Sequence, residues 1–396
     1  MKYSYETHYK SHRPDGRIVG SLPAELARMR QNPPALDALK NPTKEEYLAW
    51  QKQIRAKATE LLCMPPMTEQ PAPVRLSTVQ REGYRVEKWE FYPDEIAAVP
   101  VLVLIPDTAT EEHPAPLVFC FPGSHHSKEM HAGEPRLPGE ACNVSGPHDL
   151  RNRMGKYYAE AGMVAVCFDN PSISELAPDH DEPLGGWDSR TVYGEMLLRE
   201  GYNYTGLAAR NAFCFFEFMK TQPYVDAERF AVSGHSLGTE TAIRMAMVSD
   251  EVKAVVYNEV VNSHRTQVLA WTEYDSPHEL LNLCSSYHII PGEARFYDHK
   301  DLCAAMAPRP LAVNEGGAEE FLNDIRNAYA CLGAEEQLQI THYPKFADPA
   351  SRNRVPVMPL YGLSNKEYYE HINCDVPDHS FRAEPSVAFL KKHFGL

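Results

Sequence analysis

The chain has 396 residues, of which 43% are hydrophobic and 23% are charged. These fractions are close to those of ordinary globular domains, and they exclude a wholly disordered, collagen-like or coiled-coil chain. The formal net charge of −15 repels polyanions such as nucleic acid, anionic membranes and unesterified pectin, so the expected partner is a neutral small molecule or a neutral glycan.

The start of the chain and its cysteines bear on the cellular setting. The first residues, MKYSYETHYKSHRPDG, are polar and charged and lack the apolar region of a signal peptide. No stretch reaches the roughly 18 apolar residues needed to cross a bilayer. Nine cysteines are dispersed without a CxxC pair, which favours reduced thiols. We therefore expect a cytoplasmic protein, or an extracytoplasmic one if a leader was removed, and the oligomeric state stays open.

Residues 1–73 are expected to form a helical extension that packs on the main domain. Proline-rich segments flank one strong helical pattern, Thr43–Leu62, which begins with the capping-box sequence TKEE. Residues 74–396 form the main domain in this interpretation.

The hydrophobic period changes to two after Val74, which indicates strands of an antiparallel start to a sheet. Apolar β-rich runs then alternate with helical segments, the pattern of a mostly parallel sheet covered by helices on both faces. The fold class is therefore α/β. Two long inserts, 264–304 and 345–378, interrupt the rhythm and are candidates for a lid or a pocket wall. The expected parallel strands are 116–121, 163–169, 229–234, 252–258, 309–315 and 338–344.

The clearest chemical motif is Gly234-His235-Ser236-Leu237-Gly238, which follows an expected strand and precedes an expected helix. This is the context of a nucleophile elbow. Glycines two residues before and after the serine permit the sharp turn that exposes its hydroxyl. We expect Ser236 to be a nucleophile; the alternative is an ordinary tight turn.

A base and an acid should complete the catalytic set, in the order serine, acid, histidine. His379 lies in the loop between the last expected strand and the last expected helix, and we expect it to be the base. His371 falls in a helix-like segment and is expected to have a structural role. A loop histidine without a function is the alternative interpretation of His379.

The choice of acid is less constrained by the sequence. Glu319 follows the strand 309–315 and is the first choice, because an acid beyond that strand can orient the imidazole. Glu259, at the end of strand 252–258, is the alternative. Glu315 and Glu320 are expected to face solvent, as most glutamates do.

Oxyanion stabilisation needs two backbone N–H groups. One should come from Leu237, after the nucleophile, and the other from Ser124 or His125 in the loop after the first parallel strand. The pair His125-His126 could suggest a metal site. No carboxylate or second histidine stands at ligand spacing and no HExxH motif occurs, so we expect no metal and no cofactor.

Several segments together resemble a known family. They are SGHSLGTE, FPGSHHSKE, VYNE, APRPLAVNEGGAEE, YPKFADP and PDHSF, and they are similar, in order, to segments of the acetyl xylan esterase-like α/β-hydrolases of bacterial polysaccharide-utilisation systems. The resemblance implies the α/β-hydrolase fold, with Ser236 as nucleophile and His379 as base. It places Glu319 where an aspartate is usual and Glu259 after the preceding strand. Relatives often have glycines at His125 and His126, and many are exported.

These observations predict a serine carboxylesterase that deacetylates a carbohydrate or a related small ester through an acyl-enzyme. The histidines of the oxyanion loop should narrow the acyl side of the pocket and favour acetyl. Alternatives are a serine peptidase of the prolyl-oligopeptidase type and a non-catalytic binding protein of the same fold. Aromatic side chains in the two inserts could stack on sugar rings: Trp271, Tyr274, Tyr287, Tyr297, Tyr361, Tyr368 and Tyr369.

Overall fold

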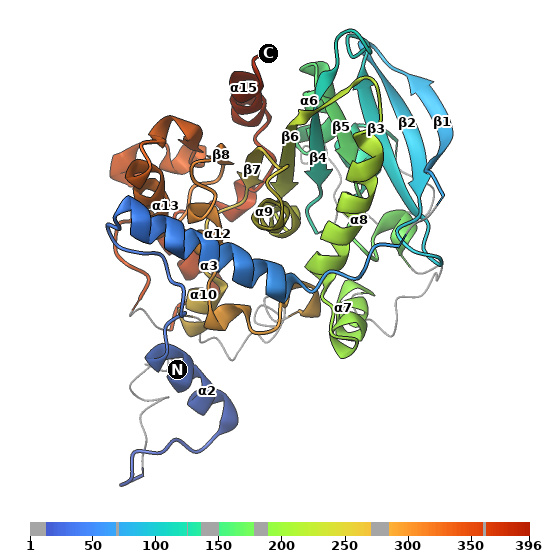
Figure 1. Cartoon of the computed structure of the whole chain (residues 1–396). Helices are drawn as coiled ribbons and strands as arrows, with labels where there is room; N and C mark the ends of the chain where they lie inside the picture. The colour runs from blue at the N-terminus through green and yellow to red at the C-terminus, as the bar shows by residue number, and fades with distance from the viewer. Residues whose placement is uncertain are drawn as a thin grey trace.

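The computed structural model describes residues 13–68, 71–124, 126–135, 150–177, 189–270, 285–358 and 362–396. Over these residues the chain forms one twisted nine-stranded sheet with helices on both faces (Figure 1). The strands are β1 (Val74–Gln80), β2 (Tyr84–Phe91), β3 (Val99–Pro106), β4 (Ala115–Phe121), β5 (Val164–Cys167), β6 (Val225–His235), β7 (Ala254–Asn258), β8 (Leu311–Val313) and β9 (Leu338–Ile340). The α-helices are α2 (Ser21–Gln31), α3 (Lys44–Leu62), α4 (Lys128–Ala132), α6 (Met154–Glu160), α7 (Ser189–Arg199), α8 (Tyr204–Met219), α9 (Gly238–Val248), α10 (His264–Ala270), α12 (His299–Ala304), α13 (Glu319–Cys331), α14 (Asn365–His371) and α15 (Ala383–Phe394).

The strand order is β1-β2-β3-β5-β4-β6-β7-β8-β9. β1 to β3 pair antiparallel, β3 pairs antiparallel with β5, and all later pairs are parallel. The predicted α/β class and the antiparallel start are confirmed. Because β4 to β9 run in the same direction, their carboxyl ends meet at one edge, where open α/β sheets bind ligands.

The strand β4 is buried on both faces, as parallel strands between two helix layers are. Leu117 and Phe119 belong to the core under α3, α8, α9 and α13. Val118 and Cys120 belong to the opposite core, under α6 and α15. Because successive side chains of β4 enter opposite cores, every position in this strand is apolar.

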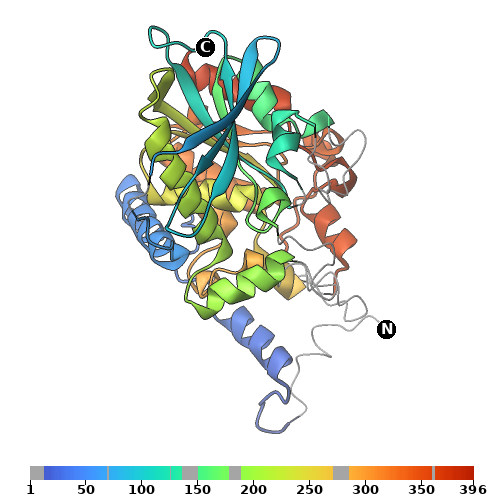
Figure 2. The ribbon, with the colours of Figure 1, turned by 90° about the vertical axis from the view of Figure 1, so that its right-hand side faces the viewer.

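The helix α3 is fixed at its start by Thr43, whose side chain accepts from the Glu46 N–H in a capping box. Its apolar face packs against α9, and the Tyr47 hydroxyl donates to the Ala304 carbonyl at 2.9 Å. Figures 1 and 2 show α2 at the end of the molecule away from the C-terminal helix α15.

The two inserts contain short helices. The first contributes α10 and α12, the second contributes α14, and residues 271–284 and 359–361 lie outside the described part. In the described part of the chain, no helix combines the length and the apolar character that crossing a membrane requires.

Candidate active site

Ser236 stands in a strained turn between β6 and α9. Its φ of 51° is in the left-handed region, which is uncommon for a residue with a side chain. The turn needs glycine on both sides: a Cβ on Gly234 would lie 2.5 Å from the Gly238 carbonyl oxygen, and one on Gly238 would lie 2.2 Å from the Phe121 carbonyl oxygen. The Ser236 N–H donates to the Asn258 carbonyl at 3.1 Å, which ties the turn to β7. This is the geometry that the GxSxG motif predicts.

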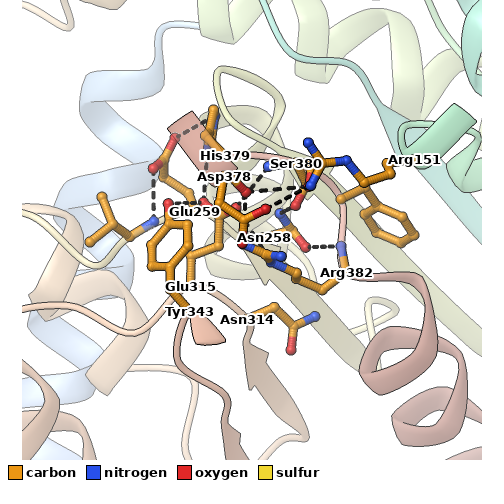
Figure 3. Close-up of polar contacts among 12 residues, drawn as sticks. Arg151, Asn258, Glu259, Asn314, Glu315, Tyr343, Asp378, His379, Ser380 and Arg382 are labelled. Atoms are coloured by element: carbon orange, nitrogen blue, oxygen red, sulfur yellow. Dashed lines mark hydrogen bonds and ion pairs between the residues drawn. The ribbon is translucent and has the colours of Figure 1, made fainter. Parts of the chain in front are cut away.

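His379 pairs with a carboxylate that the sequence analysis assigned to the surface. Nδ1 of His379 lies 2.7 Å from Oε2 of Glu315, two residues beyond β8 (Figure 3). Glu315 is fully buried and accepts two further hydrogen bonds, from the Tyr343 hydroxyl at 2.8 Å and the Ser380 N–H at 3.1 Å. A carboxylate fixed by these donors and in contact with Nδ1 holds the imidazole in one tautomer and one orientation.

Glu319 does not reach His379, so our first choice for the residue at Nδ1 was wrong. It is the first residue of α13, and its carboxylate faces Arg326 at 3.1 Å and Arg352 at 3.5 Å. We expected Glu319 to lie in a loop after 309–315, but the helix α13 already begins at this residue. That early helix start directs the side chain of Glu319 away from the imidazole.

Glu259, the alternative acid, lies on the other side of the ring. Its Oε2 is 3.8 Å from Nε2 of His379, and its Oε1 accepts from the Val260 N–H at 2.7 Å. It is therefore not at Nδ1 either. Burial, reinforced by the charge of Glu315, raises the pKa of Glu259 to about 7.

The two carboxylates dominate the charge state of His379. Burial alone would lower its pKa, but the charges of Glu315 and Glu259 outweigh that effect and raise the pKa to about 9. Arg382 opposes them weakly, because its charge also faces the site. His235 stacks under the ring at a centroid distance of 4.7 Å, and burial lowers its own pKa well below the usual value.

The loop that carries His379 is held at both ends. Asp378 accepts from Arg151 at 2.6 Å and from Arg382 at 2.9 Å (Figure 3). Asn258, the last residue of β7, bonds the Ser380 carbonyl at 3.1 Å and the Arg382 N–H at 2.7 Å. These contacts set the height of the imidazole above the sheet edge. His371 is occupied elsewhere, with Nδ1 at 2.8 Å from the side chain of Asn353.

The loop expected to supply the second oxyanion N–H, which we call the oxyanion loop, follows β4. Asn170 donates to the carbonyls of Pro122 and Gly123, each at 3.0 Å, and Ser124 faces the same cavity as Ser236 and Leu237. Leu237 is the N-cap residue of α9, so its N–H lies at the helix start, where backbone donors lack intrahelical acceptors. His125 lies outside the described residues.

We expected His126 to narrow the pocket, and this expectation was wrong. Its side chain is buried, stacks on His235 at a centroid distance of 5.3 Å and lies beside His131. A Cβ on Gly123 would meet the rings of His126 and His235 at 3.1 and 2.9 Å. The ring therefore packs under the oxyanion loop.

A cavity of about 230 Å³ opens beside Ser236. Its lining includes Ser124, Ser236, Leu237 and Glu259. In the described part of the chain, Ser236 Oγ makes no side-chain hydrogen bond, so the hydroxyl is available to a ligand. Of the aromatic residues proposed to stack on sugars, Tyr369 lines this cavity, whereas Tyr297 and Tyr368 are buried. Trp271, Tyr274 and Tyr361 lie outside the described residues.

Among the residues that the structure describes, two groups of side chains have the composition and spacing to hold a metal ion. One is His235, Glu315 and His379, within the site above, and the other is Glu240, His264 and His299. The second group also lines the cavity.

Neither Glu315 nor its partner Tyr343 was predicted from the sequence to belong to the site. Glu315 sits at the carboxyl end of a strand, which was the available signal. Tyr343, in the segment YPKFADP, is close to Glu315 only in the folded chain.

Comparisons with known proteins agree with this geometry. The sequence model of an abhydrolase family matches residues 2–392. The crystal structure of a provisionally assigned acetyl xylan esterase from Bacteroides fragilis NCTC 9343 is 34% identical, with a TM-score of 0.87, and the alignment covers 99% of this chain and 100% of that one. A methylesterase structure is 16% identical, with a TM-score of 0.54 and coverage of 93% and 78%, which is a likeness of fold alone. No functionally curated protein matches the chain.

Proposed function

The chain belongs to the abhydrolase family, and we propose that it is a serine carboxylesterase that removes acyl groups, most readily acetyl, from a carbohydrate or a related small ester. One observation carries the proposal. A strained serine lies at the carboxyl edge of the sheet next to a cavity, and a histidine paired with a buried carboxylate stacks on the residue that precedes this serine.

The residues have distinct roles in this reaction. Ser236 Oγ attacks the ester carbonyl carbon while His379 Nε2 accepts the hydroxyl proton. The N–H groups of Leu237 and of Ser124 or His125 hold the oxyanion. The imidazolium then gives its proton to the leaving alcohol, and water cleaves the acyl-enzyme by the same route. Glu315 stabilises the imidazolium throughout, because its charge lies 2.7 Å from Nδ1.

When substrate is bound, Nε2 of His379, the ring nitrogen that does not contact Glu315, must hydrogen-bond the hydroxyl of Ser236. In the structure Nε2 lies 3.8 Å from Glu259, and catalytic hydrogen bonds are often long without substrate. A bound ester carbonyl next to Ser236 would bring the hydroxyl between the ring and the oxyanion donors.

Three features support a small, neutral acylated carbohydrate as substrate. The net charge of −15 disfavours polyanionic polymers. The cavity of about 230 Å³ is smaller than most ligand pockets, and its walls include carboxylates and histidines. The structure that is 34% identical over nearly the whole chain is that of a provisionally assigned acetyl xylan esterase.

The test measures acetate release from acetylated xylo-oligosaccharides by the wild-type protein and by Ser236→Ala. We expect turnover by the wild type and a loss of roughly 10⁴-fold or more in the variant, with folding unchanged. Peptide substrates and a surface variant outside the cavity, Lys156→Met, are the controls. Peptide turnover without ester turnover, or full activity of Ser236→Ala, would refute the proposal.

A further inference from the structure

The cavity beside Ser236 carries a cluster that the esterase reaction does not use. Its members are Glu240 in the first turn of α9, His264 at the start of α10 and His299 at the start of α12. One ligand atom from each residue lies within 4.8 Å of the ligand atoms of the other two. The three residues come from separate segments, so spacing along the chain gave no sign of them.

We propose that Glu240, His264 and His299 bind one divalent transition-metal ion, with Zn²⁺ the best match. Two imidazole nitrogens and one carboxylate oxygen are the protein ligands of open zinc sites, which leave a further position for water or substrate. The cluster faces the cavity, so that position is accessible to a ligand bound there.

The carboxylate of Glu240 supplies an independent observation. The residue is 4% exposed, and its Oε1 accepts from Nδ1 of His288 at 2.6 Å. Its Oε2 is buried and has no hydrogen-bond partner within the described parts of the chain. Buried polar atoms without a partner are uncommon, and each one requires an explanation such as a bound ion or water. A cation between Oε2 and the two imidazoles fills that requirement.

The surroundings orient the cluster as ligand sites require. His299 has Nδ1 at 3.2 Å from the Tyr257 hydroxyl and Nε2 at 3.3 Å from Arg244. Both contacts are long, so an ion can replace either one. The Arg244 charge is offset by Glu293, whose Oε1 lies 3.2 Å from its Nε. The carboxylate of Glu240 therefore keeps a net negative charge at the cluster.

The ion would sit in the same cavity as the nucleophile, where its open position can take oxygen atoms from the alcohol part of a bound ester. That role rests on the proposed function, whereas the binding of the metal does not. The two can therefore be tested separately.

The experiment uses the full chain, treated with a chelator, dialysed and titrated with Zn²⁺ by calorimetry. We expect about one ion per chain. His264→Ala and the nearly isosteric Glu240→Gln should each weaken binding at least tenfold. His113→Ala, an exposed histidine between β3 and β4, is the matched control and should bind as the wild type does. Circular dichroism of each variant verifies folding, and the visible spectrum of bound Co²⁺ gives a second readout of the ligand set.

Two results would overturn the site. One is the absence of stoichiometric Zn²⁺ binding to the wild type. The other is unchanged binding in His264→Ala and Glu240→Gln, including the case in which only His379→Ala abolishes binding and the ion sits on the His379 group. Ser236→Ala separates this inference from the proposed function, because that variant should keep its Zn²⁺ and lose esterase activity. Activity retained in Ser236→Ala would count against the esterase and leave the metal site standing.

Discussion

The carboxylate of Glu315 lies 2.7 Å from Nδ1 of His379 although its side chain is fully buried. Burying a carboxylate is costly unless its oxygens are hydrogen-bonded and a cation is near. Here Tyr343 and Ser380 supply the donors, and Arg382 lies 3.9 Å away. The surrounding structure therefore stabilises a charge whose position suits one task, that of holding an imidazolium.

Glu315→Gln should lower kcat by roughly 10³- to 10⁴-fold, because an amide cannot stabilise the imidazolium or fix its tautomer. Glu319→Gln is the matched control, since Glu319 faces Arg326 and Arg352. We expect its kcat to stay within a few-fold of the wild type. Thermal unfolding of both variants separates catalysis from folding. A larger loss in Glu319→Gln than in Glu315→Gln would restore our first choice of acid.

The raised pKa of His379 predicts an alkaline rise in activity. The imidazole accepts a proton only when neutral, so kcat/KM for a neutral ester should increase with pH and level off above about 9. Glu259→Gln removes one of the two charges that raise this pKa, and the rise should move to lower pH. Because Glu259 itself titrates near 7, the wild-type profile reflects the coupled pair. An unchanged profile, or a shift to higher pH, would show that Glu259 does not act on the imidazole.

The free energy of unfolding should depend on Lys128, whose side chain is buried next to the oxyanion loop. Its side chain is fully buried, and Nζ lies 2.7 Å from Asp169 and 3.0 Å from Glu129. Lys128→Met leaves those buried carboxylates without their cation, and we expect a loss of about 3–5 kcal/mol in the free energy of unfolding. Lys156→Met, which removes a 3.6 Å helix pair with Glu160, should cost about 0.5 kcal/mol or less. Urea denaturation measures both, and equal losses in the two variants would contradict this assignment.

The small polar cavity should favour short acyl groups. We expect kcat/KM to fall from acetyl to butyryl to octanoyl esters of one alcohol, because a pocket of about 230 Å³ lined by Glu259 and Tyr257 offers a long chain little apolar surface. An apolar acyl pocket would instead gain about 0.8 kcal/mol for each added methylene. Preference for octanoyl, or a uronate methyl ester exceeding every acetyl ester, would refute the acetyl assignment.

Local patterns were enough to predict the fold and the position of the serine turn. The period-two segments gave the antiparallel strands, the βαβ alternation gave the parallel ones, and the family resemblance is confirmed by the match over residues 2–392. A nucleophile elbow is a local structure, because two glycines and a strand-to-helix change determine it. Such features can be inferred without knowing what lies across the sheet.

The acid and the shape of the pocket depend on contacts between distant segments. Glu315 lies just after β8 and reaches His379, whereas Glu319 begins α13 and faces Arg326 and Arg352. General expectation also disfavoured a fully buried glutamate. His126 turned inward because His235 offers it a stacking partner. Neither partner could be identified from spacing along the chain.

The most direct test of the account is covalent labelling of the full chain with a fluorophosphonate, followed by intact mass and peptide mapping. A nucleophile activated by His379 and Glu315 should give one adduct per chain, located on Ser236, and the loss of ester hydrolysis should follow the extent of labelling. Ser236→Ala should give no adduct. An adduct on another residue, or an active enzyme that the reagent does not modify, would contradict the assignment of Ser236 as the nucleophile.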